Sequence, residues 1–266
     1  MTRIIDLGPE PDDYRQHLVE SLSGHDKFIA CRFLYDERGS ELFDEICRLD
    51  AYYPTRVELA IMEKYMREMA RLVGPRSRIV ELGSGSGTKT RLLLDALDTP
   101  TAYLPIDISK SALRRCADRM SLLFPKLDIQ PICADYLQPI ELPEAEADTR
   151  RTVAYFPGST IGNFEPDEAV AFLGRIAEMV GPDGGLLLGV DRVKPAPILE
   201  LAYDDPQGVT AEFNLNLLRR ANREARANFD LEAFRHLAVY NDDAQRIETY
   251  LVSCRPQSVR VAGRTI

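Results

Sequence analysis

The chain has 266 residues, enough for one large domain or for a core domain with a smaller one beside it. It carries 42 acidic against 33 basic residues, a formal net charge of −9 at pH 7, which argues against a nucleic-acid-binding surface. No apolar run approaches the ~18 residues that a membrane-spanning helix needs, and the first residues lack the layout of a signal peptide. We therefore expect a cytoplasmic protein without a nucleic-acid, membrane or obligate protein partner.

Cysteine and histidine usage gives no sign of a metal centre. The five cysteines are odd in number, scattered and without a CxxC pair, as is typical of thiols in a reducing compartment. The three histidines are not clustered. The sequence therefore predicts neither a disulfide framework nor a metal site.

The first 75 residues are predicted to be mostly helical. Ser40 would begin a helix after a turn. Residues 51–56 predict an aromatic-rich loop that is held extended before Pro54. The predicted helices cover residues 11–22, 40–46 and 58–72.

The middle of the chain alternates short apolar strands with helices. Such a rhythm is typical of a parallel sheet with helices on both faces. The predicted strands cover residues 78–82, 102–106, 129–133, 152–156 and 186–190, and the helices residues 88–97, 110–123 and 167–180.

After Asp191 this rhythm ends. Residues 195–226 are predicted to be mostly helical, and residues 239–240 and 247–254 to be antiparallel strands. We expect an α/β fold, a doubly wound Rossmann-like sheet over residues 57–193. A small α+β domain, made of residues 1–56 and 194–266, would bind the substrate.

A glycine loop follows the first strand of this sheet, in the string Glu81-Leu-Gly83-Ser-Gly85-Ser-Gly87. Strand, glycine loop and helix together are typical of a nucleotide-type βαβ unit. Glycines allow positive φ angles and close approach of a ligand, and the helix start offers N–H groups. The third glycine comes one residue earlier than in the dinucleotide fingerprint, so the loop alone does not identify the ligand.

Two carboxylates follow the next two strands. Asp107 ends the second strand, where it could accept hydrogen bonds from ribose hydroxyls, and Asp135 follows the third, where it could bind an adenine amine. Lys89 lies at a helix start, which is unfavourable unless it reaches a ligand carboxylate. This pattern indicates S-adenosylmethionine. The alternative is that the acids only cap strand ends and helix starts, and that Lys89 is solvated.

The fourth strand leads into a segment of small residues that ends at Asn163. An asparagine offers both a donor and an acceptor and could orient a carboxylate or an amine, although the segment could also cap a helix. Tyrosines outside the sheet could contact a ligand or only pack, and the pattern leaves both open. They are Tyr35, Tyr52, Tyr53 and Tyr203.

Several strings together resemble the histidine Nα-methyltransferase family, the S-adenosylmethionine-dependent enzymes of the ergothioneine pathway that trimethylate the amino group of histidine to give hercynine. The resemblance runs from about Phe33 to the end of the chain. Its strings are Tyr35-Asp-Glu-Arg-Gly-Ser-Glu-Leu-Phe43, Tyr52-Tyr-Pro-Thr-Arg56, Glu81-Leu-Gly-Ser-Gly85, Lys89-Thr-Arg91, Gly158-Ser-Thr-Ile-Gly-Asn163, Ala202-Tyr-Asp-Asp205 and Gly208-Val-Thr-Ala211.

The resemblance implies roles for individual residues. Tyr35 would lie at the amino group being methylated and act in catalysis. Tyr52, Asn163 and Tyr203 would hold the substrate carboxylate, and Phe43 would line the pocket. In the cofactor site the resemblance implies Gly83, Lys89, Asp107 and Asp135. The glycine loop adds Glu81, Gly85 and Gly87 to the expected cofactor site. The expected reaction is an in-line attack of the amine on the sulfonium methyl group, with the proton leaving through water or Tyr35.

The family continues beyond Ile266 into a Glu and a Ser that recognise the imidazole and into two more strands. We expect these to be absent here, so the side-chain specificity stays open. One alternative is methylation of another amino acid, such as tryptophan. A second is a non-catalytic module that binds S-adenosylmethionine. A third, an NAD-dependent oxidoreductase, is disfavoured by the glycine spacing.

Overall fold

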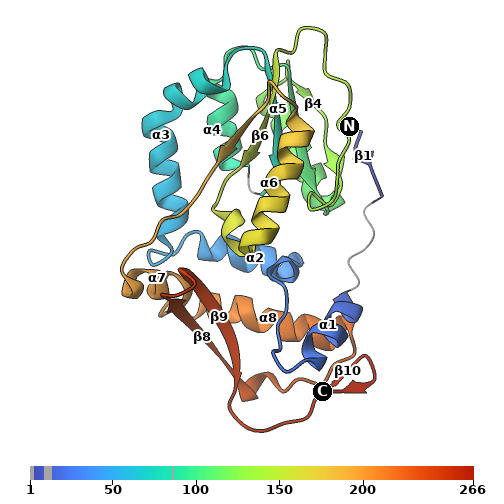
Figure 1. Ribbon diagram of the computed structural model, residues 1–266, viewed down its shortest axis with the longest axis vertical. Helices are drawn as coiled ribbons and strands as arrows, with labels where there is room; N and C mark the ends of the chain where they lie inside the picture. The colour runs from blue at the N-terminus through green and yellow to red at the C-terminus, as the bar shows by residue number, and fades with distance from the viewer. Residues whose placement is uncertain (1–2, 9–13, 86) are drawn as a thin grey trace. The chain divides into compact units, whose positions relative to one another are not determined.

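The computed structural model describes residues 3–8, 14–85 and 87–266 (Figure 1). The chain forms two compact units. The sheet unit consists of Met1–Glu10 and Val57–Asp191, and the helical unit of Pro11–Arg56 and Arg192–Ile266. No helix among the described residues is both long and apolar enough to span a membrane.

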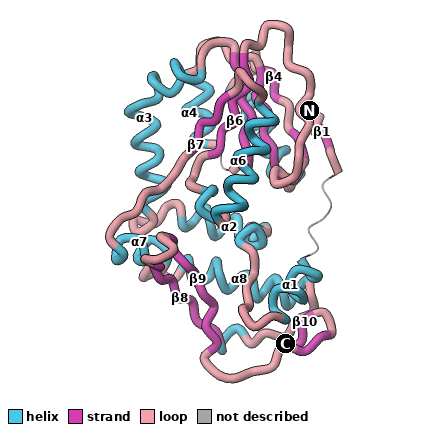
Figure 2. Tube along the Cα trace, in the orientation of Figure 1, coloured by secondary structure: helices cyan, strands magenta, loops and turns pink. Residues whose placement is uncertain are grey.

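The sheet unit contains a parallel sheet whose described strands follow the order β1-β5-β3-β2-β6-β7, with β4 also pairing with β3. Figure 2 shows the strands of this sheet in magenta, with β6 and β7 next to each other. The sheet grows in one direction from β2 through β3 and in the other through β6. A ligand binds an open α/β sheet at the carboxyl ends of the strands at such a switch point. The strands are β1 Ile5–Asp6, β2 Ser77–Leu82, β3 Ala102–Asp107, β4 Asp128–Ile129, β5 Ile132–Cys133, β6 Arg151–Phe156 and β7 Gly185–Leu188.

Helices cover both faces of this sheet. Adjacent strand residues point to opposite faces, and Ile79 and Val80 of β2 accordingly lie in two different hydrophobic clusters. The first cluster includes α3, α4 and α5, and the second includes α6. The predicted Rossmann-like α/β fold is therefore confirmed. The helices are α3 Tyr53–Val73, α4 Thr88–Ala96, α5 Lys110–Leu123 and α6 Pro166–Val180, with a short 3-10 helix, η2, at Thr160–Asn163.

The helical unit packs helices beside two hairpins. Residues 195–226, predicted to be mostly helical, form the two helices α7 and α8, and the two predicted C-terminal strands correspond to the antiparallel pair β8–β9, although β9 ends at Ser253. Its elements are α1 Tyr14–Ser23, η1 Cys31–Leu34, α2 Glu37–Ile46, α7 Ala196–Tyr203, α8 Val209–Glu224, η3 Leu231–Ala233, β8 Phe234–Asn241, β9 Arg246–Ser253, β10 Arg260–Val261 and β11 Arg264–Thr265.

Two predicted helix starts were wrong. Helix α2 begins at Glu37 rather than at Ser40, because the carboxylate of Asp36 accepts the Gly39 N–H at 2.8 Å and caps the helix. Residues 53–56 belong to α3 rather than to a loop. Pro54 lies in the first turn of that helix, where its missing N–H would have had no helical partner.

The sheet also differs from its prediction in three places. The strand predicted over residues 186–190 is β7, which begins at Gly185 and ends at Leu188. The strand predicted over residues 129–133 is divided into β4 and β5, which both pair with β3 and are separated by Gln130 and Pro131. A proline has no N–H for a sheet ladder. Residues 5 and 6 belong to the sheet unit rather than to the smaller domain, because β1 pairs with β5. Residues 11–13 of the first predicted helix lie outside the described residues.

Candidate functional site

The glycine loop joins β2 to α4 at the switch point of the sheet. Gly83, Gly85 and Gly87 have φ angles of 83°, 39° and 72°, which confirms the predicted positive φ angles. Residues with a Cβ rarely adopt this left-handed conformation. A Cβ at Gly87 would also lie 2.6 Å from the end of the Met120 side chain. The loop therefore depends on glycine for its path.

Glu81 belongs to β2, just before this loop, and its side chain is buried. The residue is 3% exposed. Its carboxylate accepts the Thr90 hydroxyl of α4 at 2.6 Å and the Tyr103 hydroxyl of β3. Burial raises the pKa of Glu81 to about 7, although both hydrogen bonds oppose the shift. Glu81 thus connects β2 to β3 and α4 through hydrogen bonds. Its contact with a cofactor stays a prediction.

Asp107 is the last residue of β3 and Asp135 comes shortly after the neighbouring strand β5, so both lie at the same edge of the sheet. Asp107 accepts the N–H and the hydroxyl of Ser84, at 3.2 and 3.1 Å, and so contacts the glycine loop. It also accepts the Ser109 N–H at 2.9 Å, while Asp135 accepts the Leu137 N–H at 2.9 Å. These bonds shape the turns after the strands. Both carboxylates keep lone pairs that can accept from ligand hydroxyls or amines.

Lys89 forms an ion pair at the start of α4. Its ammonium contacts the carboxylate of Glu58 on α3, and both side chains are about one-fifth exposed, at 21% and 19%. The two oxygens of Glu58 also lie 2.8 and 3.1 Å from the N–H of Gly158, which follows β6. Sequence reasoning missed Glu58. The only signal was an acidic residue early in a long helix, which is common on exposed helices.

In the helical unit, aromatic rings from three helices and the loops beside them form one cluster. Tyr35 lies 5.4 Å from Phe43 and 5.6 Å from Phe213, measured between ring centroids. Phe43 lies 6.2 Å from Tyr52, and Tyr52 lies 5.8 Å from Tyr203. We call these five residues the aromatic cluster. The structure therefore brings together four of the predicted residues and adds Phe213. In the sequence, Phe213 was indistinguishable from a core residue of its helix.

Two residues show how exposure and ionisation vary across the aromatic cluster. Tyr35 is 44% exposed, whereas Tyr52 is 7% exposed. Burial, followed by the neighbouring hydroxyls of Tyr203 and Tyr35, raises the pKa of Tyr52 well above its ordinary value. Tyr52 therefore remains a protonated hydroxyl that can donate to a carboxylate. The ring faces of the cluster attract cations.

Two buried asparagines of α8 form hydrogen bonds that position the residues beside Tyr35 and Tyr203, two members of the aromatic cluster. Asn216 donates to Asp36, the residue after Tyr35, at 2.7 Å. Asn214 contacts Nδ1 of His236 at 2.8 Å, and Nε2 of His236 lies 2.8 Å from the carbonyl oxygen of Tyr203. Because a carbonyl can only accept, Nε2 carries the proton and Nδ1 accepts from Asn214.

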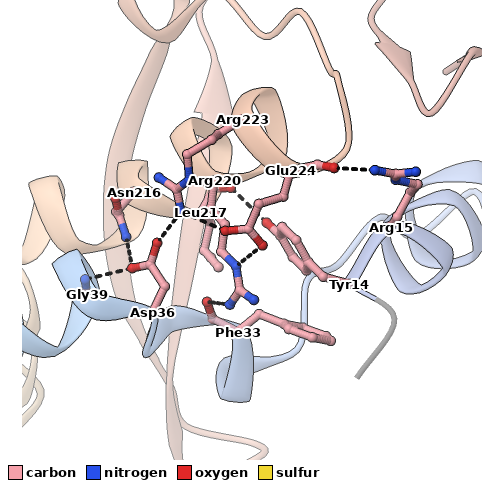
Figure 3. A network of polar contacts seen from close by, with 10 residues as sticks. All are labelled: Tyr14, Arg15, Phe33, Asp36, Gly39, Asn216, Leu217, Arg220, Arg223 and Glu224. Carbon is pink, nitrogen blue, oxygen red and sulfur yellow. Dashed lines mark hydrogen bonds and ion pairs between the residues drawn. The ribbon is translucent and has the colours of Figure 1, made fainter. Parts of the chain in front are cut away.

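Figure 3 shows the polar network around Asp36. The carboxylate accepts from Gly39, Asn216 and Arg223. Burial favours the neutral form of Asp36, but these donors outweigh it and lower the pKa of the carboxyl. Beside it, Arg220 lies over the ring of Tyr14 and donates to the carbonyl oxygen of Phe33 at 2.9 Å. Hydrogen bonds to α8 therefore hold the chain both before Tyr35, at Phe33, and after it, at Asp36.

Asn163 is the last residue of η2 and belongs to the sheet unit, whereas the other predicted substrate residues belong to the helical unit. The side chain is exposed. The next helix, α6, is capped instead by Glu165, which forms a capping box with Glu168. Helix capping is therefore not the role of Asn163. Among the described residues, no group of three His, Cys, Asp or Glu side chains could hold a metal ion.

Comparison with known proteins places these features in a family. A family model described as histidine-specific methyltransferase, SAM-dependent, matches residues 14–266. The histidine N-alpha-methyltransferase of Mycolicibacterium smegmatis is 39% identical over 253 residues, which cover 94% of this chain and 77% of that protein. The enzyme of the same name from Mycobacterium tuberculosis is 40% identical over 253 residues, with the same coverage of 94% and 77%.

A fungal relative extends this comparison. The ergothioneine biosynthesis protein 1 of Schizosaccharomyces pombe is 32% identical over 235 residues, which cover 84% of this chain and 30% of that longer protein. The sheet with its glycine loop, the match over nearly the whole chain and these identities agree. The chain belongs to the family of histidine-specific, S-adenosylmethionine-dependent methyltransferases.

Proposed function

We propose that the protein transfers methyl groups from S-adenosylmethionine to the α-amino group of L-histidine, giving hercynine for ergothioneine biosynthesis. The names of its relatives support this substrate and this pathway. The observation in the structure that carries the proposal is the aromatic cluster, in which tyrosine hydroxyls and aromatic faces occur together. An amino acid whose amine becomes a quaternary ammonium needs both kinds of contact.

The residues at the switch point fit the cofactor. The left-handed glycines Gly83, Gly85 and Gly87 lead into the N-terminus of α4, and Asp107 and Asp135 lie at the carboxyl ends of the neighbouring strands β3 and β5. We propose that Asp107 accepts from the ribose hydroxyls, that Asp135 accepts from the adenine amine, and that Lys89 binds the carboxylate. The bound cofactor supplies an electrophilic methyl group on a sulfonium.

On the substrate side, the proposed carboxylate ligands are Tyr52, Tyr203 and Asn163. The high pKa of Tyr52 supports a donor role for its hydroxyl. A charge-assisted hydrogen bond of this kind is stronger than one between neutral groups. Phe43 and Phe213 present ring faces that hold the amine after each methylation, when it has lost N–H donors but keeps a positive charge.

Tyr35 is the proposed residue at the reacting amine. An amine must be neutral to attack a methyl group, so each of the three transfers has to release a proton. Tyr35 is 44% exposed, so its hydroxyl can relay a proton between the amine and water. Most of the acceleration would come from holding the amine in line with the sulfonium methyl group, since the leaving sulfide needs no protonation.

We propose a small amino-acid substrate and a cytoplasmic location. The absence of disulfides among the described cysteines supports a reducing compartment.

The direct experiment supplies S-adenosylmethionine with histidine and follows the product by mass spectrometry. The expected products carry one, two and three methyl groups, and the trimethylated form accumulates. Histamine, which lacks the carboxylate, should react poorly. A faster reaction of tryptophan or another amino acid would replace histidine as the substrate. Binding of S-adenosylhomocysteine without methylation of any free amino acid would contradict the catalytic proposal.

A further inference from the structure

Glu58 of α3 is the side chain at the switch point to which neither the family resemblance nor the proposed function gives a role. Its carboxylate has two partners within the sheet unit. One is the ammonium of Lys89, and the other is the backbone N–H of Gly158, at 2.8 and 3.1 Å from the two oxygens. Glu58 therefore joins the start of α4 to the segment that follows β6.

The Glu58–Lys89 ion pair lies where three strands end. Gly158 and Gly189 come shortly after β6 and β7, and Lys89 follows the glycine loop after β2. A Cβ at Gly189 would collide with the carboxylate of Glu58, and one at Gly158 would lie 3.5 Å from Nζ of Lys89. Gly189 thus leaves room for the carboxylate of Glu58, and a Cβ at Gly158 would only touch Lys89. The pair lies at the carboxyl edge of the sheet, where ligands of this fold bind.

Stability alone gives a weak reason for such a pair. A lysine in the first turn of a helix opposes the helix dipole. A largely buried ion pair is often no more stabilising than apolar side chains of the same volume, because both charges lose their hydration. Both charged groups can also form further hydrogen bonds, since an ammonium has three donors and a carboxylate about four acceptor positions.

We propose that Glu58 binds the α-ammonium at the methionine end of the cofactor, beside the carboxylate that Lys89 is already proposed to bind. Two adjacent opposite charges complement the two adjacent opposite charges of an α-amino acid. Because the N–H of Gly158 and the ammonium of Lys89 already orient Glu58, little rearrangement is needed when the ligand binds. The inference rests on the use of S-adenosylmethionine in the proposed function and is independent of the methyl acceptor.

Calorimetry with three ligands tests it. S-Adenosylhomocysteine has both charged groups, its decarboxylated analogue has only the ammonium, and 5′-methylthioadenosine has neither. Glu58→Gln keeps an oxygen for the N–H of Gly158 but removes the charge. In this variant the dissociation constants of S-adenosylhomocysteine and of the decarboxylated analogue should rise about tenfold or more, as expected for loss of a charge-assisted hydrogen bond. The affinity for 5′-methylthioadenosine should be unchanged.

A second variant, Lys89→Met, should separate the two ligands that Glu58→Gln affects together. Lys89→Met should weaken S-adenosylhomocysteine but leave the decarboxylated analogue unaffected or bound more tightly. The matched control is Glu63→Gln, which changes an exposed glutamate of the same helix and should alter none of the three affinities.

Two results would overturn the inference. If Glu58→Gln weakens all three ligands equally and lowers the melting temperature, Glu58 only braces α3 against the segment after β6. If it leaves the affinity for S-adenosylhomocysteine unchanged, Glu58 is not a ligand. Failure of the proposed function is recognised separately. If the wild-type protein binds S-adenosylhomocysteine but does not methylate histidine, the methyl acceptor is a different molecule. The affinities expected of the Glu58 and Lys89 variants for the three ligands do not change in that case.

Discussion

Asn216 donates a hydrogen bond of 2.7 Å to Asp36, so a buried amide on α8 is joined to the residue that follows Tyr35. The same carboxylate caps α2 through the N–H of Gly39. A polar side chain inside a helix interface is unfavourable unless it has a specific partner. Here the partner fixes the position of the proposed proton-relaying tyrosine.

Replacement of Asn216 should therefore slow methyl transfer more than it weakens binding. Asn216→Ala leaves Asp36 with fewer donors, so the Tyr35 segment shifts and kcat falls about tenfold. The free energy of unfolding should fall by about 1–3 kcal/mol. Affinity for S-adenosylhomocysteine should be unchanged, because the proposed cofactor residues belong to the sheet unit. Steady-state kinetics with histidine and urea unfolding measure both effects.

The matched control for this prediction is Asn222→Ala on the same helix. The amide of Asn222 bonds to both backbone groups of Phe229, at 2.9 and 2.8 Å, and not to the Tyr35 segment. This variant should lose stability without a comparable loss of kcat. Equal kcat losses in the two variants would show that Asn216 has no specific role in positioning Tyr35.

His236 should affect substrate binding through Tyr203. The imidazole is buried, with 1% of its side chain exposed, and connects Asn214 to the backbone of Tyr203. His236→Leu should raise KM for histidine about tenfold, since a displaced tyrosine loses its hydrogen bond to the carboxylate. His236→Gln keeps a donor and should restore part of the affinity. An unchanged KM in His236→Leu would contradict this positioning role.

The hydroxyl of Tyr52 should recognise the carboxylate of the substrate. Tyr52→Phe keeps the ring that packs against Phe43 and Tyr203 but removes the donor. KM for histidine should rise about 10- to 100-fold, as for other hydrogen bonds to charged groups. Activity with histamine, which has no carboxylate, should be unchanged. If both substrates are affected equally, Tyr52 only packs.

Glu81 should make the stability of the protein depend on pH. Its pKa is about 7 in the folded protein, against an ordinary value of 4.5, so the folded state binds the proton more tightly. The contribution of neutral Glu81 is complete below about pH 4.5 and is lost as the pH rises through 7. The loss amounts to about 3 kcal/mol, counting 1.36 kcal/mol for each pKa unit.

Urea unfolding between pH 5 and 8 measures this effect. The Glu81→Gln variant cannot titrate at this position, so its stability should fall less over that range than that of the wild-type protein. Parallel stability curves for the two proteins would contradict the raised pKa of Glu81.

The sequence predicted the sheet better than the ends of its helices. Alternating apolar strands and the glycine loop depend on local patterns, and both are confirmed. The start of α2 was missed because Asp36 and Ser40 are both good capping residues, and the choice depends on which side chain reaches a backbone N–H. The loop predicted before Pro54 was wrong because proline is equally suited to the first turn of a helix.

In the candidate site too, features set by local sequence patterns were predicted and those set by contacts between distant residues were not. Tyr35, Phe43, Tyr52 and Tyr203 could be selected from the sequence only by family resemblance, since tyrosines in loops pack as often as they bind. Phe213 and Glu58 were missed. An apolar residue on a helix predicts a core position, and the ion pair of Glu58 with Lys89 joins residues that are far apart in the sequence. No local pattern reports such a contact.

The most direct test of histidine methylation supplies a mixture of all twenty amino acids with methyl-labelled S-adenosylmethionine and locates the label by mass spectrometry. The expected result is three labelled methyl groups on the α-nitrogen of histidine, with one S-adenosylhomocysteine released for each transfer. Label on another amino acid, on the imidazole, or on no amino acid while S-adenosylhomocysteine still binds would contradict it.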